Sequence, residues 1–239
     1  MISIVIPTFQ EEKRLPRTLD SIIKRLTLPY ELIISDGNST DRTLELAKPF
    51  NAKICVYTGT TRQKPGVGRN DGARLVTGEF IAFIDSGCTI ADPDAFFTAA
   101  LKDFEDPALM GLTAWIRVPP EEETVTDRFF LGFMNNMYLV HNNILHRGGA
   151  PGRFQMVRTS AFRAIKGYRE DLTFYEDVDL FERLNNLGRT YTDRKLTVYH
   201  QETRAKTIGW VKINYLWMMN TMWQRLFKKT FSRVWDPIR

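Results

Sequence analysis

Carboxylate side chains occur at three places in this 239-residue chain where they could support chemistry. Asp36 opens a polar turn, Asp85 follows an apolar run, and Glu176 and Asp177 are neighbours at a predicted helix start. A carboxylate at the end of a strand can bind a cation or a ligand hydroxyl, and a crowded pair can supply a general base because repulsion raises a pKa. Structural roles also fit: Asp36 could form an Asx turn, and the carboxylate pair could complement a helix dipole.

The elements that must position these side chains alternate between strand and helix. Short β-branched runs predict buried strands, and apolar residues at helical spacing, such as Leu15, Leu19 and Ile22, predict the helices between them. We expect strands at Ile2–Ile6, Leu32–Ile34, Ile54–Tyr57, Phe80–Ile84 and Gly111–Val118, and helices at Lys13–Leu28, Asp41–Phe50, Arg69–Thr77 and Pro93–Phe104, the third helix being entered through a turn at Gly66 and Gly68.

This alternation predicts an α/β fold with a Rossmann-like, mostly parallel central sheet flanked by helices. Ligands bind such sheets beyond the carboxyl ends of the strands. Thr8, Asp36 and Asp85 all lie at those ends, so their position alone marks them as candidates. The alternation loosens after residue 118, where we place a soft boundary before the acidic loop Pro119–Glu123.

Composition limits the class of protein. With 43% hydrophobic and 26% charged residues, the chain is expected to form one compact domain rather than a disordered chain. The net charge of +5 arises from the C-terminal part, and Cys55 and Cys88, in apolar strand-like context, suggest a reduced intracellular protein. The opening residues lack the pattern of a signal peptide, and no stretch has the pattern of a transmembrane helix.

Four stretches, in this order and spacing, follow a strand opening at Ile2–Gln10: Asp36–Thr43, Gly66–Ala73, Ile84–Gly87 and Phe174–Leu180. Together they resemble the inverting family 2 glycosyltransferases, over roughly residues 2–200. The resemblance implies the GT-A fold, which binds nucleotide sugars. It divides the chain into a nucleotide-sugar-binding half (1–118), an acceptor and catalytic half of the same domain (119–202) and a basic, aromatic, amphipathic helical tail (203–239).

In that family the end of the first strand and the first Asp of the second motif hold the nucleobase and ribose. The resemblance therefore assigns nucleotide-sugar binding to seven residues: Pro7, Thr8, Glu11, Asp36, Arg69, Asp85 and Ser86. For Arg69, which could place positive charge near the nucleotide, a surface salt bridge is the alternative role.

Asp85 occupies the first position of the family's DxD metal motif, and Gly87 replaces the second Asp. A divalent cation, Mn²⁺ or Mg²⁺, would then rest on Asp85, the donor's phosphates and a later ligand, for which His200 is the candidate. A lone histidine after a strand can equally be structural, and metal-independent activity is the alternative.

Glu176 and Asp177 match the family's catalytic carboxylate element, in which the Asp is the general base that takes a proton from the acceptor hydroxyl. This implies one in-line displacement that inverts the anomeric centre. The QxxRW element of processive synthases is absent, so transfer of a single sugar is expected. The rival interpretations are a catalytically degenerate nucleotide-sugar-binding module, suggested by Gly87, and a nucleotidyltransferase.

Two segments suggest where the acceptor comes from. Phe129–Ile144 is too apolar for a solvated helix, and the tail alternates tryptophans with basic residues. Both segments suit an anionic membrane surface and a lipid-linked acceptor, which predicts a location on the cytoplasmic face of the cell membrane. The alternative interpretation is that the tail packs onto the domain or forms a homo-oligomer. Nucleic-acid binding is disfavoured. The tail residues concerned are Trp210, Trp217, Trp223, Trp235, Lys212, Arg225, Lys228, Lys229 and Arg233.

Overall fold

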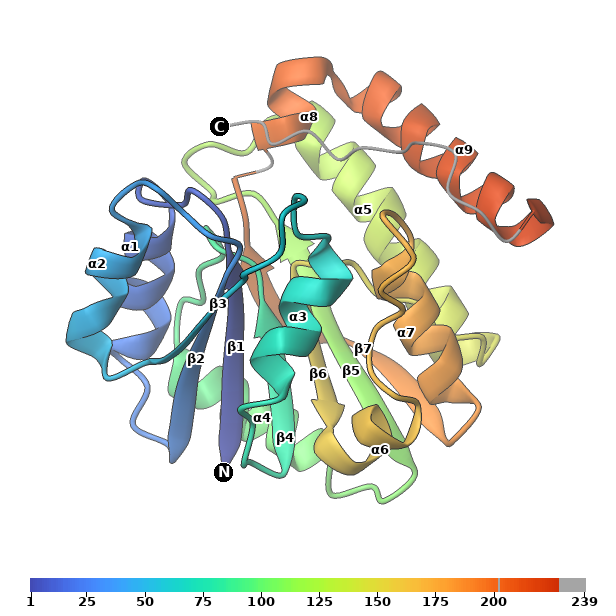
Figure 1. The fold of residues 1–239 in the computed structure, drawn as a ribbon. Helices are drawn as coiled ribbons and strands as arrows, with labels where there is room; N and C mark the ends of the chain where they lie inside the picture. Colours follow the sequence, from blue (N-terminus) through green and yellow to red (C-terminus); the bar gives the residue numbers. More distant parts are fainter. Residues whose placement is uncertain (202, 228–239) are drawn as a thin grey trace.

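The computed structural model describes residues 1–201 and 203–227, and its centre is a seven-stranded sheet (Figure 1). The strand order is β3-β2-β1-β4-β6-β5-β7, and β6 runs antiparallel to both of its neighbours while the other pairs are parallel. The mostly parallel sheet expected from the sequence is confirmed. The strands are β1 (Ile2–Thr8), β2 (Tyr30–Asp36), β3 (Lys53–Val56), β4 (Phe80–Ile84), β5 (Leu109–Arg117), β6 (Phe154–Arg158) and β7 (Arg189–Tyr199).

Helices cover both faces of this sheet. Side chains alternate along a strand, so Ile4 of β1 points into one apolar core and Val5 into the other. The first core is closed by α1, α2, α4, α5 and α9, and the second by α6 and α7, with α3 against β1 and β2. The helices are α1 (Leu15–Thr18), η1 (Leu19–Ile23), α2 (Thr43–Ala47), η2 (Lys48–Phe50), α3 (Pro65–Ala73), α4 (Pro93–Asp103), α5 (Val125–Leu139), η3 (Val140–Ile144), α6 (Thr159–Ala164), α7 (Glu176–Asn185), α8 (Thr203–Ile208) and α9 (Trp210–Phe227).

Several expected elements have different bounds. The helix expected over Lys13–Leu28 is confined to Leu15–Ile23, as α1 and η1. Gly66 and Gly68 lie inside α3 instead of in a turn before it, because Pro65 starts the helix at a position where its missing N–H has no cost. Cys55 lies in the exposed edge strand β3 and is only partly buried, whereas Cys88 is buried.

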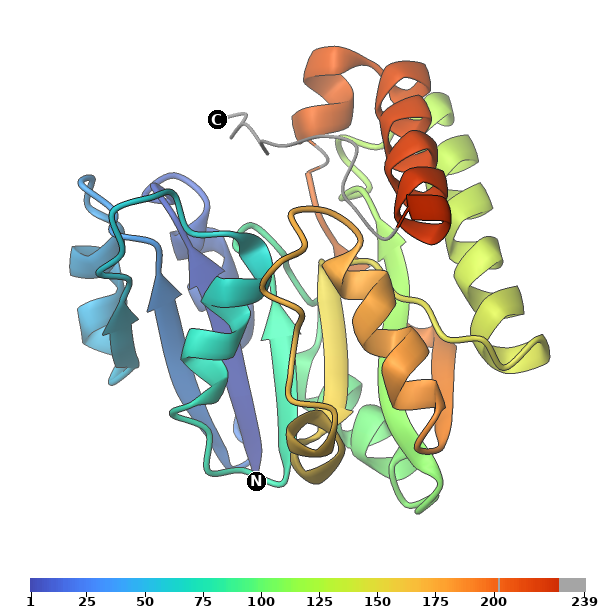
Figure 2. The same ribbon diagram turned by 45° about the vertical axis from the view of Figure 1, so that its right-hand side comes forward.

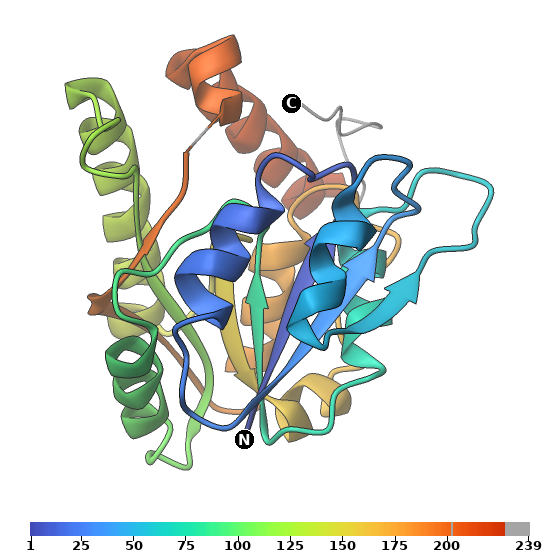
Figure 3. The ribbon, with the colours of Figure 1, turned by 90° about the vertical axis from the view of Figure 1, so that its left-hand side faces the viewer.

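The carboxyl ends of β1, β2 and β4 meet at one edge of the sheet, at the top of Figure 1. The amino ends of α3 and α7 face the same region, as the turned view in Figure 2 shows. Figure 3 shows α1 and α2 side by side at the β2 end of the molecule. Loops and helix starts therefore converge where the sequence places its candidate residues.

The C-terminal helices pack against α5. The indole Nε1 of buried Trp210 donates a hydrogen bond of 2.6 Å to Asp127, and its ring stacks on Phe130 at 5.5 Å. Packing of the tail onto the domain, one of the two expected alternatives, is thus realised by the inner side of α9. None of the helices in the described ranges is long and apolar enough to cross a membrane. Lys228, Lys229, Arg233 and Trp235 lie outside the described residues.

Candidate active site

Arg69 forms the centre of the site. Its guanidinium, from α3, donates to Asp85 Oδ1 at the end of β4 (2.8 Å) and to Glu176 Oε1 at the start of α7 (3.0 Å). The Arg69 side chain is only 5% exposed, so both contacts are shielded from water. Three elements distant in sequence therefore meet at one buried cation, and the exposed salt bridge considered for Arg69 is wrong.

Asp177 lies beside this cluster. A Cβ added to Gly152 would stand 2.8 Å from Arg69 Nη2 and 3.4 Å from Asp177 Oδ2, so both groups border the same glycine. The backbone N–H of Val178 donates to Asp177 Oδ1 at 2.8 Å, and Gln155 Nε2 donates to the Asp177 carbonyl at 3.0 Å. Strand β6, which the sequence did not predict, thus fixes the backbone of the candidate base.

Burial and crowding shift the protonation of Glu176 and Asp177, the two neighbouring carboxylates at the start of α7. Burial is the largest cause and raises the pKa of Glu176 to about 8, with repulsion from Asp177 adding to it and Arg69 opposing it. The pKa of Asp177 is also raised, mainly by burial and despite the attraction of Arg69. Both pKa values are raised in the direction that the sequence suggested, but burial is the main cause and like-charge repulsion is the smaller one for Glu176. The role of Asp177 as general base stays a prediction.

Thr8, Asp36 and Ser39 form a second cluster, whose members are hydrogen-bonded to one another. Asp36 Oδ1 accepts hydrogen bonds from the hydroxyls of Thr8 (2.8 Å) and Ser39 (2.7 Å), and Oδ2 accepts from the Ser39 N–H (2.6 Å). Asp36 is completely buried. The Asp36 carboxylate therefore has a structural role, as the alternative supposed, but its backbone bond reaches Ser39, three residues on, and not the second residue as in an Asx turn. Ligand binding by Thr8 and Asp36 stays a prediction.

The other predicted donor-binding residues surround these two clusters. Pro7 aligns with Ser35 of β2, and the Glu11 N–H donates to Thr43 Oγ1 at 2.7 Å while its carboxylate pairs with Arg14 at 3.8 Å. The buried Ser86 hydroxyl makes no hydrogen bond within the described part of the chain. A donor ligand beside Asp85 would give that hydroxyl a partner.

The residues present fit a divalent cation that is carried by a diphosphate. Such a cation takes one or two carboxylates from the protein because phosphate oxygens and water fill its other positions. Asp85 is 33% exposed, and among the described contacts only its Oδ1 is engaged, by Arg69. No three His, Cys, Asp or Glu side chains in the described residues gather into a metal site of their own.

The predicted second ligand, His200, follows β7. Its backbone N–H donates to the Arg117 carbonyl, and Tyr199 bridges to Thr89, four residues beyond Asp85. The fold therefore brings the two segments into the same region. Ligation by His200 stays a prediction.

Sequence reasoning missed several residues that border the site. Gly152 and Arg153 precede the unpredicted strand β6, Arg153 lies 5.8 Å from the ring of Trp217, and Tyr168 lies 5.5 Å from the Arg69 guanidinium. Tyr175, just before Glu176, has a left-handed backbone with φ of 73°. Gly152 ends the glycine-rich stretch 148–152, which the sequence marks as a flexible loop next to the acceptor side but not as a neighbour of Arg69. No sequence pattern marks Arg153 or the tyrosines.

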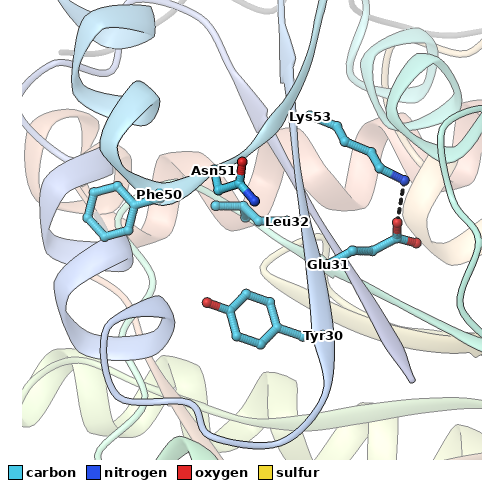
Figure 4. A pocket seen from close by; sticks show the side chains of 6 residues that line it. All are labelled: Tyr30, Glu31, Leu32, Phe50, Asn51 and Lys53. Atoms are coloured by element: carbon cyan, nitrogen blue, oxygen red, sulfur yellow. Dashed lines mark hydrogen bonds and ion pairs between the residues drawn. The ribbon is translucent and has the colours of Figure 1, made fainter.

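A hollow of about 250 Å³ lies at the other edge of the sheet, where β2 and β3 begin (Figure 4). It is lined by Tyr30, Leu32 and Phe50, and the ammonium of Lys53 is paired with Glu31 at 2.6 Å. It is separated from the carboxylate cluster by the length of the strands, so it forms no part of the site.

A mostly parallel α/β sheet with Asp85, Glu176 and Asp177 gathered at the carboxyl ends of its strands is typical of the α/β proteins that bind ligands at that edge. The chain matches the family model described as "Glycosyl transferase family 2" over residues 3–166, more than half of its length. This chain belongs to glycosyl transferase family 2. The nucleotidyltransferase interpretation is therefore wrong.

Similar proteins agree with this assignment. The chain is 25% identical over 225 residues to the "Succinoglycan biosynthesis protein ExoA" of Rhizobium meliloti (strain 1021), a match covering 89% of this chain and 67% of that protein. It spans a fifth or less of two other curated relatives, which are 32% and 35% identical over 92 residues.

Solved structures show the same fold. S. aureus TarS (1–349) in complex with UDP superposes with a TM-score of 0.65 at 20% identity, covering 83% of this chain and 59% of that one. The mannosyltransferase PcManGT from Pyrobaculum calidifontis, in complex with GDP-Man and Mn²⁺, gives 0.67 at 16% identity, covering 84% and 56%. The expected GT-A fold is thereby confirmed.

Proposed function

We propose that the protein is an inverting glycosyltransferase that moves one sugar from a nucleotide-diphosphate sugar to an acceptor hydroxyl. The observation that carries the proposal is the meeting of Asp85, Glu176 and Asp177 around the buried Arg69. Asp85 is 33% exposed, so a donor diphosphate can approach it, and Asp177 borders the same guanidinium beside Gly152. We assign the leaving group to Asp85 and the acceptor hydroxyl to Asp177.

Asp177 is the general base in this proposal. It removes the proton from the acceptor hydroxyl as that oxygen bonds to the anomeric carbon, and the bond to the diphosphate oxygen breaks in the same step. The raised pKa of Asp177 favours this proton transfer. A divalent cation held by Asp85, with His200 as the proposed second protein ligand, would supply positive charge to the diphosphate leaving group.

The donor class is supported by the fold neighbours, whose bound ligands are UDP in one and GDP-Man with Mn²⁺ in the other. Pro7, Thr8, Glu11 and Asp36 are proposed to hold the nucleoside, and Ser86 to bond to the donor through its unpartnered hydroxyl. In this role the internally bonded Asp36 fixes the shape of the nucleoside site as well as lining it.

The catalytic proposal is tested with Asp177→Asn and a matched control, Asp179→Asn. Both carboxylates lie in the first turn of α7, but Asp179 pairs with Arg183 at 2.7 Å and not with Arg69. Transfer is measured with UDP-, GDP-, CMP- and dTDP-sugars, each with and without Mn²⁺ or Mg²⁺, and donor binding is measured by thermal shift.

We expect Asp177→Asn to keep the donor-induced thermal shift and to lose about 10²–10⁴-fold in turnover, the usual contribution of a general base. Asp179→Asn should retain most turnover. Donor binding by the wild type without transfer to any acceptor would favour a degenerate binding module instead. Equal turnover in both variants would remove Asp177 from the role of base.

The acceptor is proposed to be lipid-linked and the protein to bind an anionic membrane surface at its cytoplasmic face. Helix α9 runs beside α5 (Figures 1 and 2), and each helix exposes an apolar stripe. Phe133 of α5 is 65% exposed and Val211 of α9 is 76% exposed, and the basic residue Lys212 follows Val211 in the sequence. Apolar stripes with basic neighbours suit an anionic bilayer. The exposed apolar side chains are Val125, Phe129, Phe133, Met137, Val140, Ile144, Val211, Tyr215, Met218, Met222, Trp223, Leu226 and Phe227.

Vesicle cosedimentation tests this surface. The wild type should sediment with phosphatidylglycerol vesicles and less with phosphatidylcholine vesicles, and the double variant Phe133→Glu/Val211→Glu should stay in solution. Leu187→Glu, an exposed leucine after α7, is the control. If sedimentation is the same with both kinds of vesicle and the same for the wild type and the double variant, the proposal is refuted. If the double variant differs from the wild type only in the molecular mass of the particle in solution, a homo-oligomer is favoured.

A further inference from the structure

Tyr175 holds a strained conformation immediately before the candidate catalytic pair. Its φ of 73° and ψ of 0° are left-handed, a region that bulky side chains rarely adopt. Such a residue costs on the order of 1–3 kcal/mol and persists only where its surroundings hold it. With this backbone conformation at Tyr175, α7 begins at Glu176, whose carboxylate contacts Arg69.

Two charged side chains hold the ring of Tyr175 in place. Its hydroxyl donates to Glu182 Oε1 at 2.5 Å and accepts from Arg225 Nε at 3.2 Å, and Arg225 Nη2 reaches the same Glu182 oxygen at 3.2 Å. The Arg225 guanidinium also lies 6.0 Å from the ring centroid. Glu182 belongs to α7 and Arg225 to α9, so the clamp joins the catalytic turn to the C-terminal helix.

Helix α9 also touches the other side of the site. Trp217, two turns before Arg225, lies 5.8 Å from the Arg153 guanidinium, and the Arg153 carbonyl accepts the backbone N–H of Asp85 at 3.1 Å. The same helix therefore contacts the chain beside the cation-competent carboxylate and the chain beside the base. Its remaining face carries the apolar stripe.

We propose that Arg225 is a positioning residue: with Glu182 it holds Tyr175, and thereby sets the orientation of Asp177. The packing of α9 against the domain then governs the geometry of the base. Because α9 also carries part of the surface proposed to bind the membrane, membrane binding and turnover are coupled. This inference rests on the proposed function, in which Asp177 takes the acceptor proton.

The test compares Arg225→Gln, Arg225→Lys and Tyr175→Phe with Arg189→Gln. Arg189 is a close match because it pairs with Asp106 at 2.6 Å and lies 5.5 Å from the ring of Tyr191, at the far end of β7. Turnover, donor KM and the pH profile of kcat are measured for each full-length variant, together with hydrogen–deuterium exchange of the peptide that contains residues 174–178.

For Arg225→Gln and Tyr175→Phe we expect kcat to fall about 10- to 100-fold with donor KM unchanged, since small displacements of a reacting group have effects of this size. The acid limb of the kcat profile should shift, the 174–178 peptide should exchange faster, and Arg225→Lys should recover part of kcat. Arg189→Gln should match the wild type in all four readouts.

Two outcomes overturn the inference. One is an Arg225→Gln enzyme whose kcat and pH profile match those of Arg189→Gln. The other is unchanged exchange of the 174–178 peptide, which is informative even without turnover. A wild type that transfers no sugar would instead refute the proposed function, so the two failures are distinguishable.

Discussion

Glu176→Gln should change how stability depends on pH. Glutamine keeps the shape of the side chain and an oxygen that can accept from Arg69, but it cannot ionise. In the wild type, burial and the neighbouring Asp177 raise the pKa of Glu176 from its ordinary value near 4.5 to about 8. The folded state therefore retains this proton after the unfolded chain has lost it, and the free energy of unfolding falls as the pH rises from about 4.5 to about 8.

The size of the effect follows from linkage. Each pKa unit corresponds to about 1.4 kcal/mol, so the full penalty above pH 8 is on the order of 5 kcal/mol. Between pH 6 and pH 8 the penalty grows by about 2 kcal/mol. The variant Glu176→Gln lacks this pH-dependent loss of stability. Asp177, whose pKa is also raised, makes its own pH-dependent contribution to stability in both proteins.

Urea denaturation at pH 6, 7 and 8 measures the difference directly. The free energy of unfolding of Glu176→Gln minus that of the wild type should rise by about 2 kcal/mol across this range. Glu105→Gln, at an exposed position in the turn after α4, is the control and should run parallel to the wild type. If the Glu176→Gln curve also runs parallel, Glu176 is ionised in the fold and the reasoning on the crowded pair fails.

Three further substitutions test the packing and charges around the sheet. Gly72→Ala should lower the free energy of unfolding by about 1–3 kcal/mol in urea titrations, since its Cβ would stand 2.5 Å from Val5 Cγ1; an unchanged midpoint would contradict this. Gly87→Asp, which restores the second acidic position of the DxD motif, should lower the free energy of unfolding by about 1 kcal/mol, because the backbone φ of 91° favours glycine. A thermal denaturation that shows a stabilised variant would contradict this. Burial and the nearby Asp193 raise the pKa of Asp103 from 3.8 to about 6, so the free energy of unfolding falls as the pH rises through that interval. Asp103→Asn should therefore raise stability by about 1 kcal/mol at pH 8, after allowance for solvent, and by nothing at pH 3.5; equal gains at both pH values would point to packing instead.

The strands that the sequence predicted share one feature: their signal is local. Phe80–Ile84 is a continuous apolar run and Ile2–Ile6 is apolar except for Ser3; the structure contains both strands, the former with the same bounds. Strand β6 (Phe154–Arg158) has Gln155 and Arg158 within five residues, so its apolar signal is weak. Its place between β4 and β5 comes from pairing with them, which no local pattern reveals.

Residue types and spacing by themselves determined the α/β architecture, the edge of the sheet at which Asp36 and Asp85 lie, and the identity of the carboxylate pair, because these depend on short-range periodicity and on motifs. Only the tertiary structure decided what Arg69, Tyr175 and α9 do. Arg69 meets Glu176 across 107 residues of sequence, and Arg225 meets Tyr175 across 50. Contacts of that range arise from packing of whole elements, so the position of Arg69 between Asp85 and Glu176 and the contacts of Tyr175 with α9 follow from the fold and not from any segment alone.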